Sequence, residues 1–119
     1  MILKGFLMSV NAGAEAEYGR RHRPIWRELE VVLKTHGVWR YSLFLHPETC
    51  QLSGYAEIEG EARRAAIART PECQRWWRYM GKVMPAKPDD SPVVTDLKEI
   101  LHLDCAARTG SSCRKLHAP

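Results

Sequence analysis

The sequence has no long hydrophobic segment, although 45% of its 119 residues are hydrophobic. Its longest apolar runs are far shorter than the about 20 residues that a membrane-spanning helix requires. Met1 is followed directly by a segment of strand character, whereas a secretory signal has a basic stretch and then an apolar core. We therefore expect a cytoplasmic protein without a membrane partner.

Cysteines are few, and their spacing is not that of metal ligands. The chain has four of them, Cys50, Cys73, Cys105 and Cys113, without a CxxC pair. They are expected to be free thiols in a reducing compartment. The sequence also lacks a glycine-rich phosphate loop and a dinucleotide fingerprint, so we expect no cofactor and no metal.

The net charge is only +4, and the C-terminal residues account for part of it. Three basic residues and one acidic residue lie in 104–119, which leaves 15 basic and 13 acidic residues before them. An excess of two positive charges over some hundred residues is too small to indicate binding to nucleic acid. We therefore expect no nucleic-acid partner.

The patterns of apolar residues predict one domain over residues 1–103. Strands are expected at 2–10, 38–46, 51–59 and 97–103, and helical regions at 14–36 and 60–84. Pro24 and Pro71 are each expected to divide a helical region and begin its second segment, because proline fits the first turn of a helix. Residues 85–94, with three prolines, are expected to form a loop, and residues 104–119 a disordered tail.

The order β-α-β-β-α-β predicts a ferredoxin-like α+β fold, in which helices cover one face of a four-stranded antiparallel sheet. The first strand is apolar on both faces, with Phe6 and Met8 on one and Leu3 and Leu7 on the other. An uncovered sheet face would expose the second pair to water. We therefore expect a homodimer joined through its sheet faces, the arrangement of a dimeric α/β barrel.

The first helical region places two polar aromatic side chains on its apolar face. Steps of four, three, four and three residues align Tyr18, His22, Ile25, Leu29 and Val32. Tyr18 and His22 are therefore expected to point inward, where a polar group without a partner costs free energy. Two interpretations are open, namely a small polar pocket between helix and sheet, or a satisfied core histidine beside an amphipathic tyrosine.

Further aromatic residues are expected near the same region. Tyr41 shares a strand face with Trp39, and Trp76 and Trp77 lie in the second helical region. Adjacent helical residues differ in direction by roughly 100°, so at most one of these two tryptophans faces the core completely. One imidazole, two phenols and two indoles suit a small polyol, because indole faces cover C–H patches while phenols and imidazole bind hydroxyls.

Four strings of residues together resemble the L-rhamnose mutarotase family. They are Tyr18-x-Arg20-Arg21-His22-x-Pro24-Ile25-Trp26, then Tyr41, then Cys73-Gln74-Arg75-Trp76-Trp77-x-Tyr79-Met80, then Met84-Pro85-Ala86-x-Pro88-Asp89-x-Ser91-Pro92-Val93. The resemblance extends from Met1 to about Leu103. It implies a small cytoplasmic homodimer of ferredoxin-like fold that interconverts the α and β anomers of L-rhamnose without a cofactor.

The resemblance also implies roles for individual residues. The family's catalytic histidine matches His22, and its sugar-binding positions match Tyr18, Tyr41, Trp76 and Trp77. Ring opening requires that a proton leave the anomeric hydroxyl and that one reach the ring oxygen. A group that titrates near neutral pH is able to do either, so we assign to His22 the transfer to the ring oxygen. The complementary group stays open between Tyr18 and an ordered water.

Three arginines surround this histidine in the sequence. Arg20, Arg21 and Arg23 carry positive charge close to the imidazole of His22. Like charges disfavour protonation, so they are expected to lower the pKa of His22.

Two other functions are compatible with the residues and the fold. The first is a small cofactor-free monooxygenase or lactone isomerase, in which His22 acts on an aromatic substrate packed against the tryptophans. The second is a module that binds a sugar or haem without catalysis, with His22 as a ligand. The same fold supports unrelated chemistries, so the fold alone does not decide between them.

Overall fold

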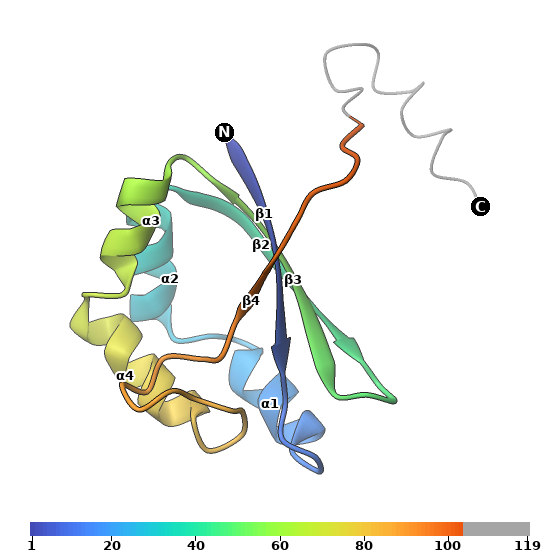
Figure 1. Ribbon diagram of the computed structural model, residues 1–119. Coiled ribbons are helices and arrows are strands. Elements are labelled where there is room, and N and C mark those ends of the chain that lie inside the picture. Colours follow the sequence, from blue (N-terminus) through green and yellow to red (C-terminus); the bar gives the residue numbers. More distant parts are fainter. Residues whose placement is uncertain (104–119) are drawn as a thin grey trace.

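The computed structural model describes residues 1–103, and the expected disordered tail, 104–119, lies outside the described residues. The elements in chain order are β1 (Ile2–Ser9), α1 (Glu15–His22), α2 (Arg27–Thr35), β2 (Val38–His46), β3 (Gln51–Ile58), α3 (Glu61–Ile67), α4 (Pro71–Met80) and β4 (Thr95–Leu97). The predicted β-α-β-β-α-β order is confirmed, with each helical region divided in two (Figure 1).

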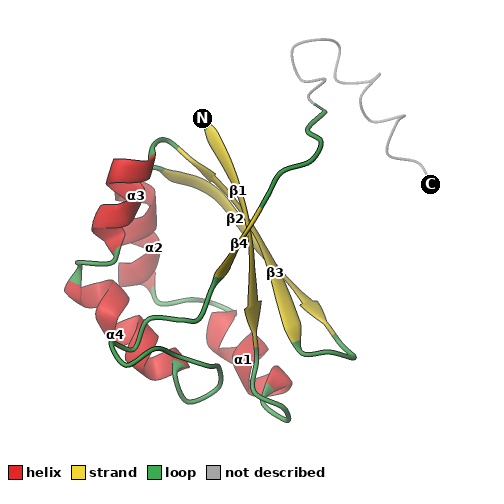
Figure 2. Ribbon diagram, viewed as in Figure 1, coloured by secondary structure: helices red, strands yellow, loops and turns green. Residues whose placement is uncertain are grey.

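The four strands form one antiparallel sheet in the order β2-β3-β1-β4. All four helices lie on the same side of this sheet (Figure 2). β1 and β3 pair along their whole length, from Ile2 opposite Ile58 to Ser9 opposite Gln51. The ferredoxin-like α+β fold is therefore confirmed. Within the described residues, no helix is long and apolar enough to cross a membrane.

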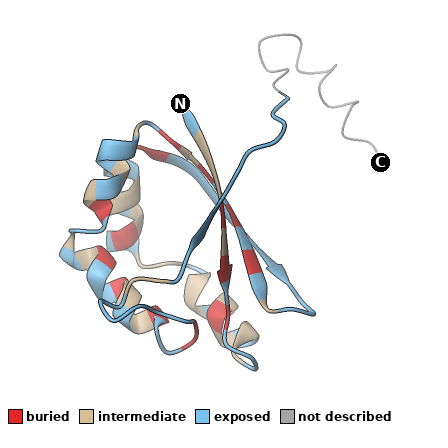
Figure 3. Ribbon diagram, viewed as in Figure 1, coloured by how far each residue is buried: buried red, intermediate tan, exposed pale blue. Residues whose placement is uncertain are grey.

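The core lies between the helices and the inner face of the sheet (Figure 3). Alternate residues of β3 are buried, and Phe6 and Met8 of β1 face the same way, as expected. On the outer face, Leu3 and Leu7 are half-buried, whereas Phe44 of β2 is exposed. None of the four helices in the described part of the chain covers that outer face (Figure 2).

The helical regions are broken near the expected prolines, but one of the breaks differs in detail. Pro71 begins α4 as predicted, and the hydroxyl oxygen of Thr70 caps this helix by accepting a hydrogen bond from the Cys73 N–H at 3.2 Å. Pro24, however, does not begin α2. It follows a cis Arg23–Pro24 peptide in the connection, and α2 starts only at Arg27.

α4 is shorter than the sequence predicted. The second helical region was expected to continue to Met84, but α4 ends at Met80. Gly81 follows, and the N–H of Val83 donates to the carbonyl of Met80 at 2.9 Å, which is a turn and not a continuing helix. Met84 is nevertheless buried in the loop after α4, where the N–H of Asn11 donates to the carbonyl of Val83 at 2.9 Å. The helical spacing in the sequence therefore predicted correctly that Met84 is buried, but it predicted the wrong secondary structure for this residue.

β2 departs from strict alternation at its start. A bulge places Val38 opposite Ile58 and Arg40 opposite Glu57, so Trp39 is an extra residue without a partner on β3. Val38 is buried and Trp39 is exposed. The common face that was expected for Trp39 and Tyr41 is therefore interrupted, whereas Tyr41 and the rest of β2 remain in register with β3.

The last strand is also shorter than expected. The sequence predicted a strand at 97–103, but β4 covers Thr95–Leu97 and pairs with only three residues of β1. The chain then leaves the sheet (Figure 1), and Ile100 and Leu101 are 87% and 83% exposed. Residues 2–4 of β1 extend past this point, but they pair with no residue after Leu97, because the chain turns away from the sheet.

The packing of Phe6 yields a first prediction. A Cβ on Gly54 of β3 would lie 2.0 Å from the Phe6 ring, and Phe6 in turn packs against Tyr41 with 5.7 Å between ring centroids. We expect Gly54→Ala to lower the free energy of unfolding by about 1–3 kcal/mol, because the ring must move within a packed core. Gly60→Ala is the control, since its Cβ would meet nothing within 4 Å. Equal denaturation midpoints for both variants would contradict this account.

Candidate active site

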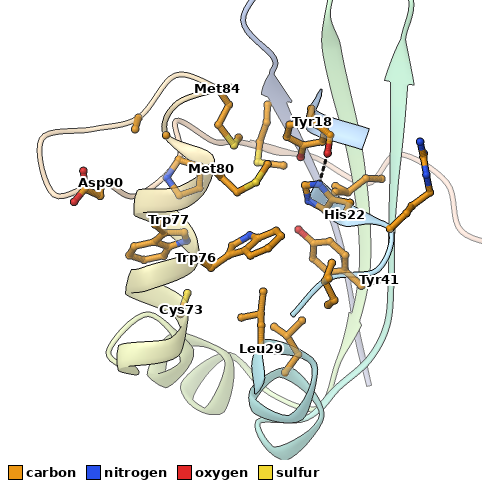
Figure 4. Close-up of a pocket in the computed structure, with 18 residues that line it drawn as sticks. Tyr18, His22, Leu29, Tyr41, Cys73, Trp76, Trp77, Met80, Met84 and Asp90 are labelled. Carbon is orange, nitrogen blue, oxygen red and sulfur yellow. Dashed lines mark hydrogen bonds between the residues drawn. The ribbon is translucent and has the colours of Figure 1, made fainter. Parts of the chain in front are cut away.

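A cavity of about 500 Å³ lies between α1, α2, α4 and the inner face of the sheet (Figure 4). Its size is typical of sites for small molecules. The five residues proposed from the sequence all line it: Tyr18, His22, Tyr41, Trp76 and Trp77. They come from three separate elements, α1, β2 and α4, so the tertiary structure is what brings them together.

His22 is held by its own helix. Its Nδ1 lies 2.9 Å from the carbonyl oxygen of Tyr18, one turn earlier in α1 (Figure 4). A carbonyl oxygen only accepts hydrogen bonds, so Nδ1 must carry the proton. In the neutral ring, Nε2 then has a free lone pair. His22 is therefore both a satisfied helical histidine and a lining residue of the cavity, so each of the two interpretations of the sequence describes part of its environment.

Burial lowers the pKa of His22 below its usual value, since the charged ring would lose hydration. The hydrogen bond to the Tyr18 carbonyl acts in the opposite direction, and the positive charge of Arg23 lowers the pKa further. The expectation that Arg20 and Arg21 also lower it is not met, because both guanidinium groups pair with the carboxylate of Glu17. The neutral imidazole is the favoured form.

Aromatic rings on two sides fix the orientation of the imidazole. The Tyr18 ring lies 4.3 Å from it between centroids, and the Trp76 ring meets it edge to face at 5.3 Å. With Nδ1 hydrogen-bonded as well, the ring has little freedom to rotate. The lone pair on Nε2 of His22 therefore has a fixed direction.

Tyr18 and Tyr41 place two hydroxyl groups near His22. Burial raises the pKa of Tyr18 well above its usual value and the pKa of Tyr41 to about 12. Tyr41 is 48% exposed as a residue, yet its oxygen points into the cavity toward Trp76 and His22 (Figure 4). Both phenols therefore stay protonated at neutral pH and are able to donate hydrogen bonds.

The two tryptophans differ in burial, as the sequence predicted. Trp76 is buried in the middle of the cavity wall, and Trp77 is half-buried toward the loop after α4 (Figure 4). Trp76 packs edge to face on Trp26, at 5.1 Å between centroids, and Tyr79 lies against both. Analysis of the sequence did not assign a role to Trp26 or Tyr79, although both lie within the strings that mark the resemblance.

Arg21 ties α1 to this aromatic cluster. Its guanidinium lies 4.0 Å above the Tyr79 ring, and it also donates to the backbone carbonyl of the same residue. The side chain is mostly buried and pairs with Glu17 at 2.7 Å. Arg21 therefore holds α1, and with it His22, against α4.

Several lining residues were not identified from the sequence. Met80 and Met84 lie together on an apolar side of the cavity, and Asp90 of the following loop lies beyond Trp77 (Figure 4). Met8 also lines the cavity. Only the near-helical spacing of the two later methionines indicated that they face inward. Burial raises the pKa of the lining thiol Cys73 to about 11, so it is not a nucleophile at neutral pH. Among residues 1–103, no group of three or more His, Cys, Asp or Glu side chains is arranged to hold a metal ion.

Comparison with known proteins identifies the family. The family model for L-rhamnose mutarotase matches residues 4–103. The chain belongs to the L-rhamnose mutarotase family. A protein from Opitutus terrae named L-rhamnose mutarotase is 72% identical over 104 residues, which are 87% of this chain and all of that protein.

Solved structures agree with this assignment. The crystal structure of an L-rhamnose mutarotase from Formosa agariphila superimposes with a TM-score of 0.80 at 32% identity, over 87% of this chain and all of that one. A structure from Bordetella bronchiseptica described as a putative antibiotic biosynthesis monooxygenase reaches a TM-score of 0.61 at 14% identity, over 83% of this chain and 97% of that one. The second likeness concerns the fold alone.

The environment of His22 yields a second prediction. Because burial and Arg23 favour the neutral ring, NMR titration is expected to place the His22 midpoint below about 6.5, the unperturbed value. Arg23→Gln removes one cause and should raise this pKa, whereas Arg20→Gln, whose charge is paired with Glu17, should leave it unchanged. A midpoint above 6.5 in the unmodified chain would show that the imidazole is not desolvated.

Proposed function

We propose that the chain is a cofactor-independent L-rhamnose mutarotase, an isomerase that interconverts the α and β anomers of the sugar with His22 as its acid–base group. The carrying observation is Nε2 of a neutral imidazole, which has no hydrogen-bond partner among residues 1–103 and belongs to a ring that lines a cavity of monosaccharide size. The family match and the name of the 72% identical relative support the same reaction.

Tyr18, Tyr41, Trp76 and Trp77 are proposed to bind the sugar around His22. Trp76 and Trp77 offer indole surface to the C–H groups of a pyranose, and the methionine side of the cavity suits its methyl group. The phenol hydroxyls donate hydrogen bonds to its oxygens. A pyranose held in this way has its anomeric carbon close to the imidazole, since both phenols and His22 lie at one end of the cavity (Figure 4).

Proton transfer then follows from the resting state of His22. Its Nε2 accepts the proton of the anomeric hydroxyl while the bond between C1 and the ring oxygen breaks. The imidazolium gives that proton to the ring oxygen, which leaves an open-chain aldehyde with a free hydroxyl. Donation to the ring oxygen is the role assigned to His22 from the sequence. The proton that His22 donates is the one that its Nε2 has accepted from the anomeric hydroxyl. General acid–base catalysis of this kind is worth about 10²–10⁴-fold.

The phenols stabilise the intermediate charge. When the bond to the ring oxygen breaks, negative charge develops on oxygen before the imidazolium delivers its proton. In this proposal the protonated hydroxyls of Tyr18 and Tyr41 donate to that oxygen, and hydrogen bonds to developing charge accelerate a reaction. After rotation about C1–C2, the same steps in reverse close the ring from the other face of the aldehyde.

We also propose that the chain acts in the cytoplasm as a homodimer joined through the outer faces of two sheets. The outer face carries Leu3 and Leu7 of β1, Phe44 of β2, Tyr55 of β3 and Leu97 of β4. Phe44 is 64% exposed in the single chain. A second copy would remove this apolar surface from water without contacting the cavity, which is lined by the helices and the opposite, inner face of the sheet.

The mechanism yields a third prediction. His22→Ala is expected to reduce the protein-catalysed exchange between L-rhamnose anomers by about 10²–10⁴-fold, because the only proton carrier of the mechanism is lost. Saturation-transfer NMR on equilibrated L-rhamnose measures this exchange directly. His36→Ala is a matched control, since Nδ1 of His36 contacts the carbonyl of Val32 at 2.8 Å in the same way but lies outside the cavity.

The same experiment separates the alternatives. Exchange that persists in His22→Ala would contradict the role of the imidazole. Binding of L-rhamnose without accelerated exchange in the unmodified chain would favour a binding module. If the unmodified chain neither binds L-rhamnose nor accelerates its exchange, the proposed activity is refuted.

The outer sheet face yields a fourth prediction. Phe44→Asp places a charge within the proposed dimer interface and is expected to convert the dimer to a monomer in light scattering at micromolar concentration. Val31→Asp is the control, because Val31 is an exposed apolar residue of α2 and lies away from the outer sheet face. A monomer before any substitution would refute the interface.

A further inference from the structure

Asp90 gives the cavity a polar group at the end opposite His22. Among the described residues that line the cavity, only Arg23 and Asp90 carry a formal charge at neutral pH. Asp90 lies on the loop side of Trp76 and Trp77, whereas His22 lies on their other side (Figure 4). The indole surfaces therefore separate a proton-transfer end of the cavity from an end with a carboxylate.

The loop around Asp90 is closed by its own backbone. The N–H of Lys87 donates to the Ser91 carbonyl at 2.8 Å, and the N–H of Asp90 donates to the Lys87 carbonyl at 2.9 Å. Ala86 and Pro92 form an isolated β-bridge at the base of the loop. The position of Asp90 is thus defined by main-chain contacts, which do not require its side chain.

The two neighbouring carboxylates have different roles in this loop. Asp89 uses its carboxylate locally, by accepting from the backbone N–H of Ser91 at 3.0 Å and from the Ser91 hydroxyl. Within residues 1–103, the carboxylate of Asp90 makes no hydrogen bond and no ion pair. It is therefore free to accept hydrogen bonds from a molecule in the cavity.

We propose that Asp90 is a specificity-determining residue, whose carboxylate accepts hydrogen bonds from the sugar hydroxyls farthest from the anomeric centre. The inference rests on the proposed function, which places C1 and the ring oxygen at His22. In a pyranose the atoms across the ring from these are C3 and C4, and both carry hydroxyls in L-rhamnose. Two carboxylate oxygens are suited to two adjacent hydroxyls, because each accepts from one donor.

In this proposal Asp90 contributes to binding of the sugar, whereas His22 transfers the proton. Hydrogen bonds to remote hydroxyls form equally in the closed sugar and during ring opening, so they contribute to binding more than to the chemical step. Loss of the carboxylate should therefore raise KM with little change in kcat. A sugar without a hydroxyl at C3 or C4 should already lack part of this binding in the unmodified chain.

Two variants test the proposal without straining the loop. Asp90 has a positive φ of 73°, a conformation that asparagine and glycine adopt readily. Asp90→Gly removes the carboxylate and is expected to raise KM for L-rhamnose about 2- to 10-fold, the range for a typical net hydrogen bond, because Asp90 is exposed to water. Asp90→Asn keeps one acceptor oxygen and should show a smaller rise. Asp96→Asn, on exposed β4 outside the cavity, is the charge-matched control.

The deoxy sugars decide the outcome. The unmodified chain should discriminate L-rhamnose from its 3-deoxy or 4-deoxy analogue, and Asp90→Gly should lose this discrimination for at least one of them. Equal discrimination by both proteins, or a fall in kcat with unchanged KM, would overturn the assignment to Asp90 while leaving the mutarotase activity intact. Absence of exchange in the unmodified chain would instead refute the proposed function. Sugar binding measured by calorimetry would then still test Asp90.

Discussion

The hydrogen bond between Nδ1 of His22 and the carbonyl of Tyr18 is the interaction on which the site depends. It joins a residue of α1 to the backbone of the same helix, so the helix itself determines which nitrogen carries the proton. The other nitrogen is then free and points away from the helix axis into the cavity. The packing of α1 against the sheet and α4 turns this local contact into a site, because it surrounds the ring with aromatic side chains.

The cavity contains few charges, and this matters for the chemistry that we propose. Burial favours the neutral imidazole of His22 and the protonated phenols of Tyr18 and Tyr41. A neutral sugar enters without the need to displace a bound counter-ion. The charges that appear during ring opening are transient and meet a hydrogen-bond donor and an acceptor that are already in place. The arginines of α1 contribute mainly outside the cavity, by pairing with Glu17 and by holding Tyr79.

Sequence patterns identified most of the fold and the residues of the candidate site. The predictions of secondary structure were wrong where burial or alternation of residues arose without the expected helix or strand. Met84 has helical spacing because it is buried, but it is buried by a loop. Trp39 alternates with Tyr41, but a bulge removes it from the ladder. Residues 98–103 have a strand-like pattern, but the chain turns away from β1 after Leu97 and pairs with none of residues 2–4. In each case the local sequence reports burial or alternation, whereas secondary structure also requires hydrogen-bond partners.

The sequence by itself determined the element order, the proline at the start of α4, the glycine after α2, the inward face of α1 and the family to which the strings belong. These follow from local periodicity and from residue types, which act over a few neighbours. Only the tertiary structure decided that Tyr41, Trp76 and His22 line one cavity, that Arg21 binds Tyr79 and that Asp90 lies across from the imidazole. These groups are far apart along the chain, and their contacts depend on how helices pack on a sheet. Contacts between residues that are far apart in the chain produce no repeating pattern of residue types in the sequence.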